Sequence, residues 1–160
     1  FSHSVRSSAR TRQEKIVRKL GGQVVGGDRG PLDGFTHVVV PAPGKEGSNF
    51  RRSRDALVAL ARGLPIVSEN WLLSCEAAHT FLDGADFLLQ DPSAERKFRF
   101  AMGESLRRAR ESGVLRGRRV YVTPGVDAVV LRLFAEVVPL AGGSLVSGRV
   151  TQFTLSLIHI

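Results

Sequence analysis

Apolar and polar positions alternate with helical spacing near the start of the chain. Residues 11–20 place apolar side chains three and four positions apart, with basic side chains between them, which predicts an amphipathic helix. The pair Gly21-Gly22 follows directly, and glycine readily takes the left-handed conformation in which helices end. The pattern therefore predicts a helix that stops at this glycine pair.

Short apolar and β-branched runs then alternate with further helical stretches. Prolines or glycines end several of these runs, as expected at the ends of strands and helices. The predicted strands are 23–25, 35–40 and 64–67, the predicted helices are 55–62 and 69–77, and 81–89 is predicted to be an extended closing segment. Alternation of this kind is typical of an α/β fold, in which helices cover a mainly parallel sheet.

A second unit follows a connecting segment that begins at Asp91-Pro92, a pair that suits a helix start. The connector is predicted to contain a helix at 105–112. The order of strand, helix, Gly-Gly and strand then appears over residues 119–146 and resembles the order at the start of the chain. This internal repeat predicts a second copy of the first unit.

These patterns divide the chain into four parts. We expect the first unit to lack much of its leading strand, the second to be truncated after its Gly-Gly turn, and the last residues to be a non-native tail. The first domain is assigned to 1–90, the linker with its helix to 91–117, the start of the second domain to 118–150, and the tail to 151–160.

The charge of the chain favours an anionic partner. The formal net charge is +8, and arginines gather at 51–54, 107–110 and 116–119. Basic surfaces of this kind suit nucleic acid, phosphopeptides or acidic proteins. The last two clusters are equally consistent with solvated helix and loop faces.

Motifs for other functions are absent from the sequence. A single cysteine, Cys75, supports neither a disulfide framework nor a structural zinc site, and the four histidines lack metal-ligand spacing. No catalytic motif is present, no apolar run approaches the roughly 20 residues that span a bilayer, and no leader-like segment opens the sequence. We therefore expect a protein that is not an enzyme and has no cofactor, no metal and no membrane partner.

Several motifs, in order, resemble the BRCT family. Trp71 within 71–75 is the strongest signal, and the stretch 98–125 resembles the linker and second-domain start of tandem BRCT pairs. The other matching motifs are Gly21-Gly22, 36–39, 59–67 and 81–89. The resemblance implies a BRCT fold with a four-stranded parallel sheet flanked by helices and with Trp71, Gly21 and Gly22 as structural core positions.

The resemblance also implies a function and a binding site. It implies recognition of a phosphoserine motif on a protein partner, in DNA-damage signalling or repair, in the nucleus. Ser2 matches the phosphate-binding hydroxyl and His3 the residue whose backbone N–H assists it. The usual phosphate-binding lysine falls at Asp55, so Arg54 is expected to supply the cation instead.

The neighbouring basic residues are expected to bind the rest of the peptide. Arg52 matches a position that reads the peptide in related pairs, and Arg51 lies beside it. Two alternatives remain open because Asp55 would repel a phosphate. One is binding of DNA or chromatin through the arginine clusters, and the other is a phosphate-independent scaffold that uses the helix carrying Trp71.

Overall fold

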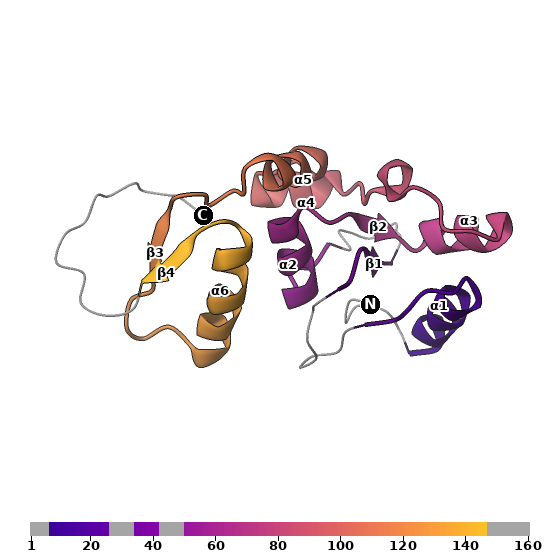
Figure 1. Ribbon diagram of the computed structural model, residues 1–160, viewed down its shortest axis with the longest axis horizontal. Coiled ribbons are helices and arrows are strands. Elements are labelled where there is room, and N and C mark those ends of the chain that lie inside the picture. Colours follow the sequence, from indigo (N-terminus) through magenta and orange to yellow (C-terminus); the bar gives the residue numbers. More distant parts are fainter. Residues whose placement is uncertain (1–6, 26–33, 42–49, 147–160) are drawn as a thin grey trace.

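The computed structural model of the 160-residue chain describes residues 7–25, 34–41 and 50–146. Helices and short strands follow one another along the described chain, and Figure 1 shows them as two groups of different size. The first group comprises α1 (Ser7–Lys19), β1 (Val38–Val40), α2 (Arg54–Arg62), β2 (Ile66–Ser68), α3 (Asn70–Ala78) and the 3₁₀ helix η1 (Gly84–Phe87). The connector holds α4 (Pro92–Phe98) and α5 (Met102–Glu111), and the second group holds β3 (Arg119–Tyr121), α6 (Ala128–Leu140) and β4 (Ser144–Val146).

Strands β1 and β2 pair in parallel, with Val39 opposite Val67. Successive side chains of a strand point to opposite faces, and the two faces belong to different apolar clusters. Val38 and Val40 pack with α2, α4 and α5, whereas Val39 packs with α1 and α3. Helices therefore cover both faces of this small sheet, as expected for an α/β fold.

The expected four-stranded sheet is not formed within the described residues. Those residues make two separate two-stranded parallel sheets, one from β1 and β2 and one from β3 and β4. Residues 23–25, predicted to be a strand, carry no strand pairing in the described part of the chain. The physical reason is that a strand needs a neighbouring strand to which its backbone is hydrogen-bonded. No described segment pairs with 23–25 in this way.

The closing segment of the first group also differs from the prediction. Instead of a continuous extended run over 81–89, the chain forms η1, which Asp83 caps by accepting a hydrogen bond from the backbone N–H of Ala85 at 2.9 Å. Leu88 then makes a single antiparallel bridge with Val67 of β2. The short polar stretch before Leu88 favours a turn over a strand.

Helices α1 and α6, one in each group, both end at a glycine pair and do so in the same way. In α1 the N–H of Gly21 donates to the carbonyl of Arg18 at 3.0 Å and that of Gly22 to Val17 at 2.9 Å. In α6 the corresponding bonds, from the glycine pair at 142–143, measure 2.9 and 3.0 Å. This is the Schellman pattern, and the first glycine of each pair has a positive φ of 82° or 83°. The repeated glycine pair therefore has a repeated structural role.

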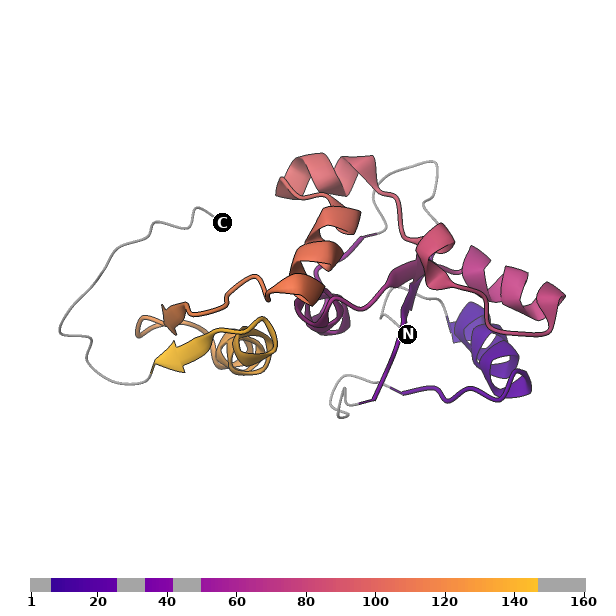
Figure 2. The ribbon, with the colours of Figure 1, turned by 45° about the horizontal axis from the view of Figure 1, so that its top comes forward.

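The second group joins the first through its helix. Figure 1 shows α6 between α2 and the sheet of β3 and β4, and Figure 2 shows the same order after rotation. The strands pair in parallel, with Val120 opposite Leu145. No helix among the described residues is both long and apolar enough to cross a membrane.

The connector is fixed to the first group by a buried carboxylate. Asp91 is 5% exposed and caps α4 by accepting a hydrogen bond from the backbone N–H of Ala94 at 2.9 Å. Its other carboxylate oxygen accepts from the backbone N–H of Phe50 at 3.1 Å. The helix start predicted at Asp91-Pro92 is thus confirmed, and the same side chain ties α4 to the segment before α2.

Candidate functional site

The start of α2 is the part of the described structure where the basic residues singled out in the sequence meet the connector and the second group. Ser53 caps this helix, because its side chain accepts a hydrogen bond from the backbone N–H of Ala56 at 3.3 Å and its own backbone is extended. Arg51 and Arg52 come just before the cap, and both are exposed. Two cations therefore flank the end of the helix that carries partial positive charge.

Arg52 contacts an aromatic ring of the connector. Its guanidinium lies 4.5 Å from the centre of the Phe98 ring, and Lys97 approaches the same ring at 5.4 Å. Such cation–π contacts orient a guanidinium without neutralising it. Phe98 was not among the expected site residues, and the sequence pointed to it only as part of the stretch 98–125 that resembles a tandem BRCT linker.

Arg54 is bound to a carboxylate of the second group. Its Nε lies 2.7 Å from Oε2 of Glu136 and its Nη2 lies 2.7 Å from Oε1, a two-pronged arrangement. The hydrogen bonds to Glu136 raise the pKa of Arg54, against a smaller opposing effect of burial. The cation that was expected to bind phosphate thus joins α2 to α6 in this structure. Sequence reasoning missed Glu136, which lies 82 residues further along the chain.

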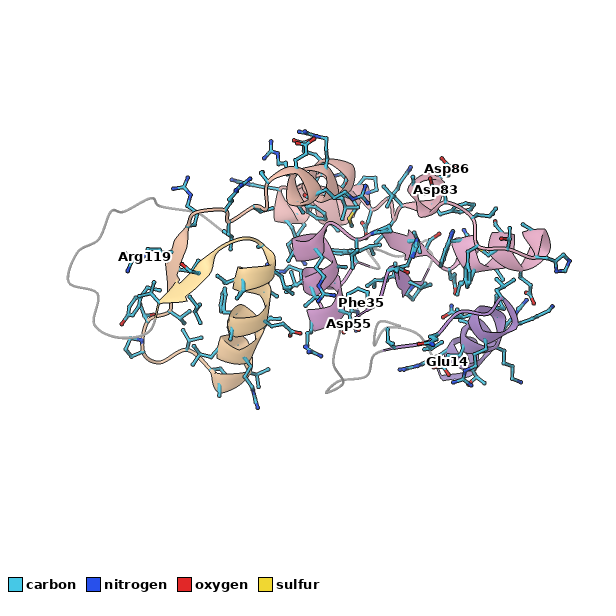
Figure 3. All side chains as sticks on the ribbon, viewed as in Figure 1. Glu14, Phe35, Asp55, Asp83, Asp86 and Arg119 are labelled. Carbon is cyan, nitrogen blue, oxygen red and sulfur yellow. The ribbon has the colours of Figure 1, made fainter. Side chains whose placement is uncertain are left out.

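Asp55 lies at the edge of a cavity of about 550 Å³. Figure 3 shows Asp55 and Phe35 beside α2, and both line this cavity. The other lining residues come mainly from 21–25 and from 34–39. Two titratable side chains, Asp55 and His37, are among the described residues that line the cavity, and Asp55 is the one that carries a negative charge. A phosphate at this point would be repelled by the Asp55 carboxylate.

Three rings stack on the wall of the same cavity. Trp71 is 4% exposed, and its ring centre lies 4.5 Å from that of His37 and 5.8 Å from that of Phe81. Its indole N–H donates to the carbonyl of Leu82 at 3.0 Å. Burial lowers the pKa of His37, and the charge of Asp83 acts weakly in the opposite direction. The imidazole therefore favours its neutral form.

Gly22 is enclosed by this aromatic wall. A Cβ atom added at this position would come within 2.8 Å of both the Phe81 ring and the Val17 side chain. The glycine pair thus has two separate requirements: Gly21 needs its left-handed backbone, and Gly22 needs the space.

Of the other expected site residues, Ser2 and His3 lie outside the described residues. No cluster of potential metal ligands occurs in the described part of the chain.

Comparison with protein families identifies the first unit. Residues 1–76 match the model of the BRCA1 C-terminus (BRCT) domain. This first unit belongs to the BRCT family. In the solved structures, the BRCT5-BRCT6 domains of Brc1 from Schizosaccharomyces pombe have a TM-score of 0.63 and 22% sequence identity, over 82% of this chain and 58% of that one. This similarity to a tandem BRCT structure supports the fold alone.

The similarity to known proteins extends beyond the first unit. The rat mediator of DNA damage checkpoint protein 1 is 31% identical over 150 residues, which are 94% of this chain and 11% of the relative. The human protein of the same name is 34% identical over 133 residues, which are 83% of this chain and 6% of the relative. Cattle PAX-interacting protein 1 is 35% identical over 100 residues, which are 62% of this chain and 10% of the relative.

The BRCT chain therefore corresponds to a small part of much longer relatives. It is a tandem BRCT region similar to those of the mediator and PAX-interacting proteins. It is a module related to mediators of the DNA-damage checkpoint.

Proposed function

We propose that this chain is a phosphoserine-peptide-binding module that acts in DNA-damage signalling or repair, in the nucleus. The observation that carries the proposal is the pair of exposed cations, Arg51 and Arg52, at the capped start of α2. Phosphate oxygens are recognised best where a cation and backbone or hydroxyl donors converge, and a helix start contributes such donors. The names of the relatives supply the cellular setting.

The second part of the proposal concerns which residues hold the phosphate. Ser2 is proposed to donate its hydroxyl and His3 its backbone N–H. The sequence predicts Arg54 as the third contact, but that guanidinium is already bound to Glu136. We therefore propose that Arg51 and Arg52 supply most of the positive charge and that Arg54 reaches a phosphate only when its pair with Glu136 opens.

The domain organisation belongs to the same proposal. A first BRCT domain would occupy 1–90, a linker 91–117 and the start of a second BRCT domain 118–150. The contact between α2 and α6 supports this division, since it brings the helix that carries the proposed phosphate site against the second group. A peptide bound at the start of α2 would then lie close to this junction.

The proposal is tested with a labelled peptide mixture that has one fixed phosphoserine among randomised positions, and with its unphosphorylated counterpart. We expect binding of the phosphorylated mixture only. The double substitution Arg51→Gln with Arg52→Gln should weaken that binding at least tenfold, since each lost charge-assisted contact costs about 1.5–3 kcal/mol. Fluorescence anisotropy measures both affinities.

The matched control is Arg12→Gln with Lys15→Gln on α1. It removes the same charge from two exposed side chains on a helix that has no extensive contact with α2. Equal affinity for both peptide mixtures would exclude phosphate recognition and favour a phosphate-independent scaffold. An equal loss in the control would show that net charge, rather than the start of α2, attracts the peptide.

A further inference from the structure

The segment from the connector to the start of β3 carries most of the excess positive charge of the chain. Residues 91–119 contain nine lysines and arginines and four aspartates and glutamates, an excess of five against a formal net charge of +8 for the whole chain. This excess lies outside the start of α2 and has no part in the proposed function.

Each carboxylate of the connector accepts hydrogen bonds. Asp91 accepts backbone hydrogen bonds, and Glu95 accepts one from the backbone N–H of Met102 at 2.9 Å. Glu104 binds Arg107 and Arg108, and those hydrogen bonds lower the pKa of Glu104 to about 2. Glu111 binds Arg107 as well.

Six exposed cations of the connector and β3 remain outside these ion pairs. None of the six has an ion pair within the described ranges. They are Arg96, Lys97, Arg99, Arg116, Arg118 and Arg119. They lie along successive parts of the chain, from α4 past the end of α5 to β3, and Figure 3 shows Arg119 at the outer side of β3.

A hollow between α4 and α5 concentrates part of this charge. It measures about 550 Å³, and three guanidinium groups line it, those of Arg96, Arg99 and Arg108, together with the hydroxyl-bearing Ser105. Glu95 and Glu104 also line it, with their carboxylates engaged as described above. Arg99 is held at the turn between the two helices by a left-handed backbone, with φ of 51°. The helices thus fix the cations around one depression.

We propose that this surface binds the phosphodiester backbone of double-stranded DNA. A helix of ten residues such as α5 is about 15 Å long, and phosphates follow one another every 3.4 Å or so along a DNA strand. Basic side chains from α4 to β3 can therefore follow several phosphates. Binding of this kind contains no base contact and is independent of sequence.

The aromatic residues of the connector favour a duplex over a single strand. Single-stranded DNA is typically held by bases stacked on aromatic rings. Phe98 is covered by Arg52 and Lys97, and Phe100 packs against Phe50 with 5.5 Å between ring centres. Both rings are partly buried, and no aromatic side chain in 91–119 is strongly exposed. The surface thus offers cations without a stacking platform.

The test measures binding of a fluorescent 20-base-pair duplex to the full chain over a range of salt concentrations. We expect Arg96→Gln with Arg99→Gln to weaken binding about tenfold near 0.1 M salt, and to reduce the slope of log affinity against log salt by about 2, since each phosphate contact contributes about 0.9. The control Arg12→Gln with Lys15→Gln removes the same charge from α1, which Figures 1 and 2 place away from α4 and α5. The control should retain most of the affinity and the slope.

Three results would overturn the proposal. They are equal losses in the two variants, a wild-type affinity that is insensitive to salt, and competition by polyglutamate as strong as by unlabelled duplex at equal charge. The outcome is separate from that of the proposed function, because Arg51→Gln with Arg52→Gln is expected to weaken phosphopeptide binding at least tenfold while leaving most of the duplex binding. Arg96→Gln with Arg99→Gln should have the reverse effect.

Discussion

Arg54 and Glu136 face each other across the junction of α2 and α6, joined by two hydrogen bonds of 2.7 Å. Their side chains are 33% and 28% exposed, so water screens the pair only in part. A two-pronged guanidinium–carboxylate pair fixes both distance and orientation between its helices. The pair therefore connects the first BRCT unit to the second group at a defined angle.

Removing this pair is expected to loosen the junction. Glu136→Gln should lower the free energy of unfolding by about 1 kcal/mol, and a double-mutant cycle with Arg54→Gln should give a coupling of similar size. Chemical denaturation of the four proteins measures it. A coupling near zero would mean that the apolar contacts between α2 and α6 hold the junction without help from the ion pair.

The turn after α2 depends on Gly63. Its φ is 69°, and a Cβ atom at this position would lie 2.6 Å from Cγ of Arg110 and 3.1 Å from the carbonyl oxygen of Leu106. Gly63→Ala should therefore destabilise the fold by about 2 kcal/mol, from left-handed backbone strain and crowding against α5. Thermal melting measures the change.

Gly103 provides the matched control for this substitution. It lies in α5, has no atom within 4 Å of an added Cβ, and does not have a positive φ. Gly103→Ala should leave stability unchanged or raise it slightly, because alanine favours helices. Equal melting temperatures for the two variants would show that the contact of Gly63 with α5 is not needed.

The carboxylate of Asp91 is expected to be important for the connector. Asp91→Ala would remove the cap of α4 and leave the N–H of Phe50 without this acceptor, at a cost of about 2–3 kcal/mol. Asp127 also caps a helix, through the N–H of Val129 at 2.7 Å, but it is exposed. Asp127→Ala should cost about 1 kcal/mol or less. Similar losses in urea denaturation would contradict a special role for burial at Asp91.

Acidification is expected to weaken the aromatic wall around Trp71. Burial lowers the pKa of His37 below its usual 6.5, so the unfolded chain binds a proton more readily than the folded one. Between 6.5 and that lower pKa, stability therefore decreases as the pH falls. His37→Gln should make this part of the profile flatter than in the original chain. Denaturation at several pH values between about 5 and 7.5 measures the difference. An unchanged slope would assign the pH dependence to other groups.

The sequence predicted helix ends and element order better than sheet pairing. The end of α1 at Gly21 and the start of α4 after Asp91 follow from local backbone preferences. These preferences depend only on residues that are adjacent in the sequence. Residues 23–25 have the side chains of a strand, yet pairing requires a neighbouring segment in space. For the same reason the extended segment predicted at 81–89 was wrong in its central part, where η1 forms.

The sequence by itself determined an α/β chain with a repeated glycine turn, a strong positive charge and a run of BRCT-like motifs around Trp71. Only the tertiary structure decided which charges act together. Arg54 meets Glu136 because α6 packs against α2, and Arg52 meets Phe98 because the end of α4 lies beside the residues that precede α2. Arginines that are close in the sequence thus have different surroundings. The reason is that the electrostatic field at a charge depends on its neighbours in space, and the sequence alone does not show which residues these are.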